Sequence, residues 1–255
     1  MNRKLTLLFA GLTVLLQIIW PLTQGVDRVL VTQLSVLSFA ISSFSHAVGV
    51  VGWRRTSIIA AFTASAAWLV EYFGTSTGLL FGTYEYSGIL QPQIGSVPIT
   101  VLGAWFMMLW PACVAATTTF ASKPRHIQAL FAGFLMMSWD FFLDTQMVIE
   151  GYWIWSPDSS VLIGMPGIPW TNYLSWLVVG TLLSYAILML VSTTSINRNV
   201  LGPEILLLWT WIGGFIAHSF FWNNLGTAAW GSISLGVCCL IFARAVHLNP
   251  ETIRS

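Results

Sequence analysis

Residues 127–148 read IQALFAGFLMMSWDFFLDTQMV, and this stretch decides which class of protein the chain belongs to. Its length suits an α-helix that crosses a bilayer, which needs about 20 apolar residues. Its only charged side chains are Asp140 and Asp144, which lie four residues apart and so on one face of the helix. Carboxylates inside a membrane span are energetically costly, so this pair indicates a cavity or hydrogen-bonding partners.

The composition of the whole chain also predicts a membrane protein. Of its 255 residues, 56% are hydrophobic and 7% are charged, whereas ordinary soluble domains contain about 25% charged residues. The net charge of +1, without a basic patch, gives no reason to expect a nucleic-acid partner. The three cysteines lie in apolar runs without the spacing of a metal site, so we expect them to be packing residues and expect no bound metal.

Hydropathy predicts an all-α fold, a polytopic bundle of about eight transmembrane helices. The N-terminal apolar run is taken as a retained first helix, because no small-residue cleavage site follows it. We therefore expect residues 1–255 to form a single integral membrane domain. The predicted spans are Leu5–Trp20, Val29–Val51, Ser57–Phe73, Ile99–Phe120, Ile127–Val148, Tyr173–Thr194, Ile205–Trp222 and Ala228–Val246.

Basic residues predict the orientation of these spans, because cytoplasmic loops are enriched in Lys and Arg. With a cytoplasmic N-terminus, only Arg28 of the ten basic residues falls outside. We therefore predict a multi-pass protein of the cell membrane with both termini in the cytoplasm and two long external loops, residues 74–98 and 149–172. The basic residues on the predicted inner side are Arg3, Lys4, Arg54, Arg55, Lys123, Arg125, Arg198, Arg244 and Arg254.

In this orientation, four titratable side chains converge on the outer half of the bundle. Asp140 lies about 12 Å below the outer end of its span, at 1.5 Å per residue, and Asp144 lies one turn higher. Glu71, near the end of the third span, and His218, late in the seventh, reach a similar level. The alternative for the aspartate pair is structural hydrogen bonding. The alternative for Glu71 is a solvated helix end, and that for His218 is a satisfied interfacial histidine. His46 falls near the cytoplasmic side, where interhelical hydrogen bonding is the simpler interpretation.

Two carboxylates in a low-dielectric site cannot both ionise cheaply, so one of them keeps a proton. The site then holds a carboxylic acid beside a carboxylate base. The sequence contains no phosphate-binding loop, zinc-protease motif, dinucleotide-binding glycine pattern or nucleophile elbow. Acid–base chemistry on an apolar substrate and proton-coupled transport are the two functions that remain.

Several segments together resemble the carotenoid biosynthesis protein family, which includes membrane hydratases of linear carotenoids such as bisanhydrobacterioruberin. The resemblance covers residues 71–176. It is carried by EYFGTSTGLLFGTYEYSGIL (71–90), SVPITVLGAW (96–105), WDFFLDTQMVIEGYWIW (139–155) and GIPWTNYLSW (167–176).

The resemblance implies hydration of the terminal C1–C2 double bond of an acyclic carotenoid end, without a cofactor. Glu71, Asp140 and Asp144 would be the catalytic acids and bases. We expect the deeper Asp140 to donate the proton and Asp144 to orient water, while Glu71 can exchange roles with either. The expected substrate-binding residues are Tyr84, Tyr86, Trp105, Trp139, Trp153, Trp155, Asn172 and His218.

The expected partners are a lipid-soluble linear carotenoid, membrane lipids and other enzymes of carotenoid biosynthesis. Two other functions stay open at this point. A proton-coupled transporter or lipid carrier would also use intramembrane carboxylates, although the chain shows no internal repeat of the kind common in transporters. A carotenoid cyclase or isomerase would use the same acid and end its reaction by losing a proton.

Overall fold

Long apolar segments fold into eight α-helices in the computed structural model, which describes residues 2–156, 160–165, 167–191 and 199–248. Each helix, with the short turn that continues it where there is one, is long and apolar enough to cross a membrane. The predicted helical membrane bundle is therefore confirmed. The helices are α1 (Asn2–Ile19), α2 (Gly25–Val51), α3 (Trp53–Thr77), α4 (Ile99–Thr119), α5 (Arg125–Ile149), α6 (Trp170–Leu190), α8 (Leu201–Ile216) and α9 (Leu225–Leu248).

Most helix ends lie within a few residues of the predicted spans. The first helix continues into a 3-10 turn, η1 (Trp20–Leu22), and α8 continues into a π-helical turn, η2 (Ala217–Phe221). The third helix runs four residues beyond the predicted Phe73, to Thr77. Residues 192–198, which include the predicted end of the sixth span and Arg198, lie outside the described residues, as does Arg254.

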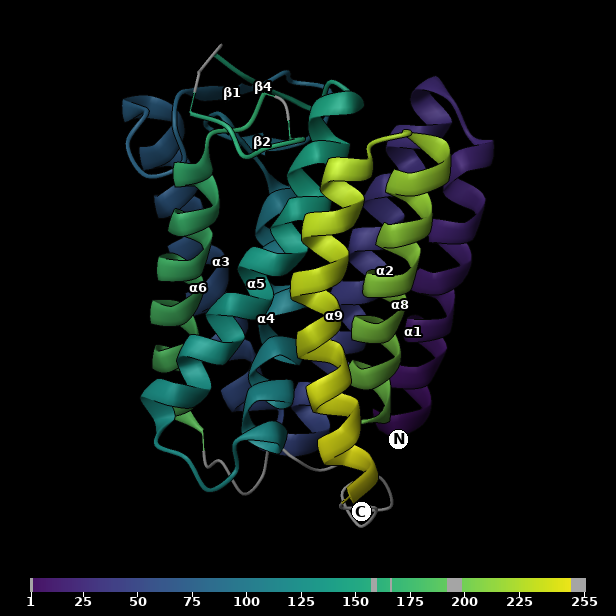
Figure 1. Ribbon diagram of the computed structural model, residues 1–255. Helices are drawn as coiled ribbons and strands as arrows, with labels where there is room; N and C mark the ends of the chain where they lie inside the picture. Colours follow the sequence, from purple (N-terminus) through teal and green to yellow (C-terminus); the bar gives the residue numbers. More distant parts are fainter. Residues whose placement is uncertain (1, 157–159, 166, 192–198, 249–255) are drawn as a thin grey trace.

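Helix α4 lies at the centre of the bundle and contacts α2, α3, α5, α6, α8 and α9 (Figure 1). Its residues from Ala104 to Thr118 are all buried. The outer helices instead expose large apolar side chains, such as Leu8 on α1 and Ile233 on α9. An apolar exterior around a packed centre is the arrangement expected of a bundle surrounded by lipid.

Two glycines permit backbone arrangements that other residues would not. Gly52 alone separates α2 from α3 and has a φ of 81°, a conformation that suits glycine. On α5, a Cβ added to Gly133 would lie 2.7 Å from the carbonyl oxygen of Leu177. Helices α5 and α6 therefore pack with their backbones in close approach, and this brings the first turn of α6 near the acidic face of α5.

The two long loops meet over one end of the bundle in a small antiparallel sheet (Figure 1). Strand β1 (Tyr84–Tyr86) pairs with β4 (Trp153–Trp155), so that Tyr84 is opposite Trp155 and Tyr86 is opposite Trp153. Alternate residues of a strand face the same side. Glu85 and Ile154 are exposed, whereas the four aromatic residues face the bundle. We call Tyr84, Tyr86, Trp153 and Trp155 the aromatic cap.

A second short hairpin, β2 (Gln93–Ile94) with β3 (Val97–Pro98), leads from the same loop into α4. At this end of the bundle, Arg28 at the start of α2 forms an ion pair with Glu150 after α5, with 2.9 Å between Nη1 and Oε2. Arg28 is the basic residue that the predicted orientation places outside. A local acidic partner balances its charge, so its position is compatible with that orientation, which remains a prediction.

Candidate active site

Glu71, in the last two turns of α3, is buried beneath the aromatic cap and accepts three hydrogen bonds. Both phenols of the cap, Tyr84 and Tyr86, donate to Oε2, the Tyr86 bond being 2.7 Å long. From α4, the indole Nε1 of Trp105 donates to Oε1 at 2.8 Å. A carboxylate has about four acceptor positions on its two oxygens. Three are occupied here, so one position on Oε1 remains for another donor.

The two phenols on the cap remain hydrogen-bond donors. Burial raises the pKa of Tyr84 and of Tyr86 well above the usual range, and the nearby Glu71 carboxylate raises both further. Neither phenol therefore ionises near neutral pH. The three groups that donate to Glu71 are therefore neutral.

A second acidic group forms where α5 meets the first turn of α6. Asp140 and Asp144 are both buried, and their carboxyl groups are close enough to interact directly. The side-chain amide of Asn172 bridges them, since Nδ2 donates to Asp140 Oδ2 at 2.8 Å and to Asp144 Oδ2 at 2.5 Å. Each of the two amide hydrogens thus has its own carboxyl acceptor.

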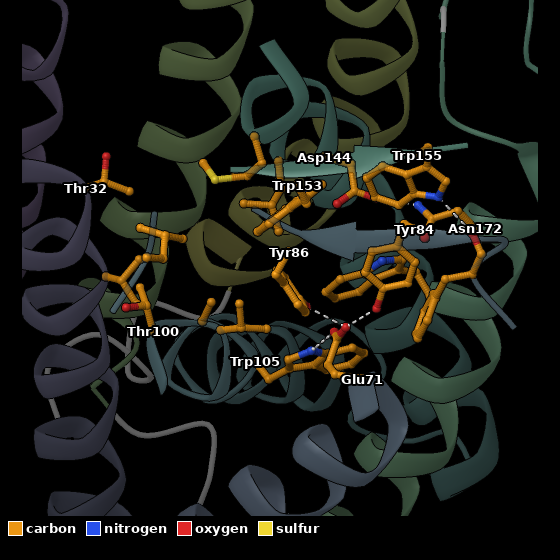
Figure 2. Close-up of a pocket in the computed structure, with 18 residues that line it drawn as sticks. Thr32, Glu71, Tyr84, Tyr86, Thr100, Trp105, Asp144, Trp153, Trp155 and Asn172 are labelled. Carbon is orange, nitrogen blue, oxygen red and sulfur yellow. Dashed lines mark hydrogen bonds between the residues drawn. The ribbon is translucent and has the colours of Figure 1, made fainter. Parts of the chain in front are cut away.

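A cavity of about 50 Å³ separates Glu71 from Asp144 and is shown in Figure 2. Asp144 lies on one side of the residues drawn and Glu71 on the other, with cap aromatics between them. A buried water molecule needs on the order of 10–15 Å³ of such space, so the cavity has room for a few waters. We call it the carboxylate cavity. Among the described residues that line it, there is no Lys, Arg or His.

The walls of the carboxylate cavity are aromatic. Tyr84 stacks on Trp155 with ring centroids 4.9 Å apart, and Trp105 stacks on Trp176 of α6 at 4.1 Å. The faces of such rings carry partial negative charge and attract cations within about 6 Å. The cavity therefore combines buried carboxyl groups with surfaces that stabilise a carbocation.

Most of the residues predicted for the site lie together. Asp140 is fully buried behind Asp144 and does not line the cavity. Trp139 and His218 line a second, neighbouring cavity, although Trp139 also contacts Trp176 edge to face. The predicted residues that line the carboxylate cavity are Glu71, Asp144, Tyr84, Tyr86, Trp105, Trp153, Trp155 and Asn172.

His218 lies at the predicted depth but faces another part of the bundle. Its ring stacks against Phe142, and its Nε2 is 3.0 Å from the Phe142 carbonyl oxygen. Residue spacing gives the depth along a helix, whereas the direction that a side chain faces depends on helix packing. His218 also lies in the π-helical turn, which changes the angular position of its side chain relative to a regular α-helix.

Trp176 is a cavity residue that the sequence reasoning missed. It lies one helical turn after Asn172, and residues four apart share a helix face. It also lies inside the quoted segment 167–176. That spacing was the signal that would have placed it in the site.

Comparisons with known proteins agree with the resemblance seen in the sequence. A family model described as "Carotenoid biosynthesis protein" matches residues 29–243. A bisanhydrobacterioruberin hydratase of Haloarcula japonica is 25% identical over 134 residues, which cover 50% of this chain and 43% of the relative. The matched region is thus less than half the length of that curated relative. No solved structure matches the chain. Because the family model covers most of its length, the chain belongs to the carotenoid biosynthesis protein family.

Proposed function

We propose that the protein is a carotenoid hydratase of the cell membrane. It adds water across the terminal C1–C2 double bond of an acyclic carotenoid end. The observation that carries the proposal is the carboxylate cavity, in which Asp144 and Glu71 lie on opposite sides of a small aromatic chamber. The family match and the hydratase name of the distant relative support a substrate of this class.

In the first step, a proton moves from the aspartate pair to C2 of the double bond, whose electrons form the new C–H bond. Asp144 is the donor in this proposal because it lines the cavity, whereas Asp140 lies behind it and shares its proton. This changes the roles expected from depth alone, which favoured Asp140 as the donor. A tertiary cation then remains at C1, next to the cap aromatics and Trp105, which stabilise it.

In the second step, a water oxygen bonds to C1 and loses one proton, so that the product is a tertiary alcohol. Glu71 is suited to hold this water, because Oε1 has an acceptor position left beside the Trp105 bond. Glu71 accepts the proton from the water, and proton exchange restores the aspartate pair. The sum is one water added per double bond, without a redox change, and the proposal requires no cofactor.

Expression in a lycopene-producing bacterium tests the activity. Mass spectrometry of the extracted pigments should show products heavier than the parent by one or two waters. Pigments of unchanged mass but altered absorption would instead indicate a cyclase or isomerase, in which the cation loses a proton before water attacks. Unaltered pigments in cells that contain the protein would contradict enzymatic action on this class of substrate.

A further inference from the structure

A second and larger cavity lies beside the carboxylate cavity. It has a volume of about 350 Å³ and is enclosed mainly by α1, α2, α5 and α8, together with the turns η1 and η2. Its wall is largely apolar and includes four tryptophans. They are Trp20, Trp139, Trp209 and Trp222.

The two cavities share part of their walls. Four residues line both cavities, two from α2 and two from α5, and so form the boundary between them. They are Thr32, Val36, Leu143 and Met147. Met147 is unbranched and has three rotatable side-chain bonds, which makes it the most adaptable member of this boundary.

Size decides which cavity can hold a hydrocarbon chain. A dry protein cavity of about 150 Å³ holds one benzene molecule. The carboxylate cavity, at about 50 Å³, is therefore too small for more than water and the reacting atoms. The neighbouring cavity is seven times larger, at about 350 Å³, and has the space that the smaller one lacks.

We infer that the larger cavity is the channel that holds the polyene chain of a linear carotenoid, whose end passes this shared boundary to reach the carboxyl groups. This inference rests on the proposed function for the identity of the ligand. Two backbone features agree with a binding role. Gly213 on α8 adds no side chain to the channel, and the π-helical turn that carries His218 lines it. Single π-helical turns in α-helices are frequent at functional sites.

The channel wall also contains polar atoms that an occupant can satisfy. His218 Nδ1 and Ser35 Oγ are buried without a hydrogen-bond partner among the described residues. Buried polar groups are normally hydrogen-bonded. Water in the channel, or a hydroxyl group on a bound chain, would supply these partners.

Filling the channel from α8 tests the inference. A Cβ on Gly213 would lie 3.4 Å from the Trp209 ring, an ordinary contact, so Gly213→Leu places its remaining atoms in the channel without a backbone clash. Thr210→Leu adds volume to the same wall and removes only a hydroxyl that bonds within its own helix, to Leu206. The control is Gly11→Leu, because Gly11 is exposed on α1 with nothing within 4 Å of its Cβ position.

Binding is measured with the full chain in detergent micelles, as quenching of tryptophan fluorescence during titration with lycopene. Wild type and Gly11→Leu should show the same saturable quenching. Gly213→Leu and Thr210→Leu should bind about tenfold more weakly or worse, because overfilling a packed site is unfavourable. Wild-type affinity for lycopene in both filled variants, or no saturable binding by the wild type, would overturn the inference that this cavity holds the polyene chain.

Turnover measured in parallel separates this inference from the proposed function. One outcome is that the wild type binds lycopene, the filled variants do not, and no water is added to the pigment. That outcome would support the binding role of the channel and contradict the hydratase proposal. If the wild type and both filled variants hydrate the pigment equally well, the hydratase proposal is supported and the binding role of the channel is contradicted.

Discussion

Replacing Asn172 by Leu isolates the bridge that holds the two aspartates together. Leucine has a similar size but no side-chain N–H group, so the hydrogen bonds of 2.8 Å and 2.5 Å to Asp140 and Asp144 are both lost. A hydrogen bond to an ionised group contributes about 1.5–3 kcal/mol and a neutral one about 0.5–1.5 kcal/mol. If the pair shares one proton, the loss of both bonds costs about 2–4.5 kcal/mol of stability.

Thermal unfolding of the purified protein in detergent measures this cost. Each kcal/mol shifts the Tm of a chain of this size by about 2–4 °C, so Asn172→Leu should lower the Tm by about 4–18 °C. The control is Ser175→Ala on the same helix, which loses a single bond, from Ser175 Oγ to the Leu80 carbonyl oxygen at 2.6 Å. Its Tm should fall much less. An Asn172→Leu protein as stable as Ser175→Ala, with full hydration activity, would refute the bridge.

Two further predictions concern the orientation and the cap. Reporter fusions after Arg55 should report the cytoplasm and fusions at Glu85 the outside, and a cytoplasmic signal at Glu85 would reverse the predicted topology. Trp153→Ala opens the aromatic cap and Tyr84→Phe removes one donor to Glu71, so each should reduce hydration by tenfold or more while protein abundance in the membrane changes less. Parallel loss of protein and activity in both variants would mean that the cap has only a structural role.

The helical framework could be predicted because each span carries its own signal. A run of about 20 apolar residues is visible in the sequence, whatever its partners are. The two aspartates could be assigned to one helix face because positions 140 and 144 lie about one helical turn apart. Pairing of β1 with β4 could not be predicted, because each strand has only three residues and its partner is distant in the sequence. The cap therefore forms through tertiary contacts between the two loops.

Eight of the residues predicted for the site line the carboxylate cavity, but their arrangement could not be predicted. Spacing places Glu71 and Asp144 at similar depths, but it does not show that Trp105 donates to Glu71 or that Asp140 lies behind Asp144. Such relations depend on the rotation of each helix about its axis, which packing determines. The same limitation explains why His218 was expected near the acids and instead lines the larger cavity.

Pigment mass spectrometry of the Asp144→Asn variant tests the central claim most directly. Asparagine keeps the size and hydrogen bonding of the side chain but is not an acid, so insertion should be normal while hydration falls about 10²- to 10⁴-fold, as expected for loss of a general acid or base. Asp140→Asn and Glu71→Gln should also lose most activity, because each removes one member of the proton path. Wild-type amounts of water-added pigment from all three variants would contradict acid–base hydration by these carboxyl groups.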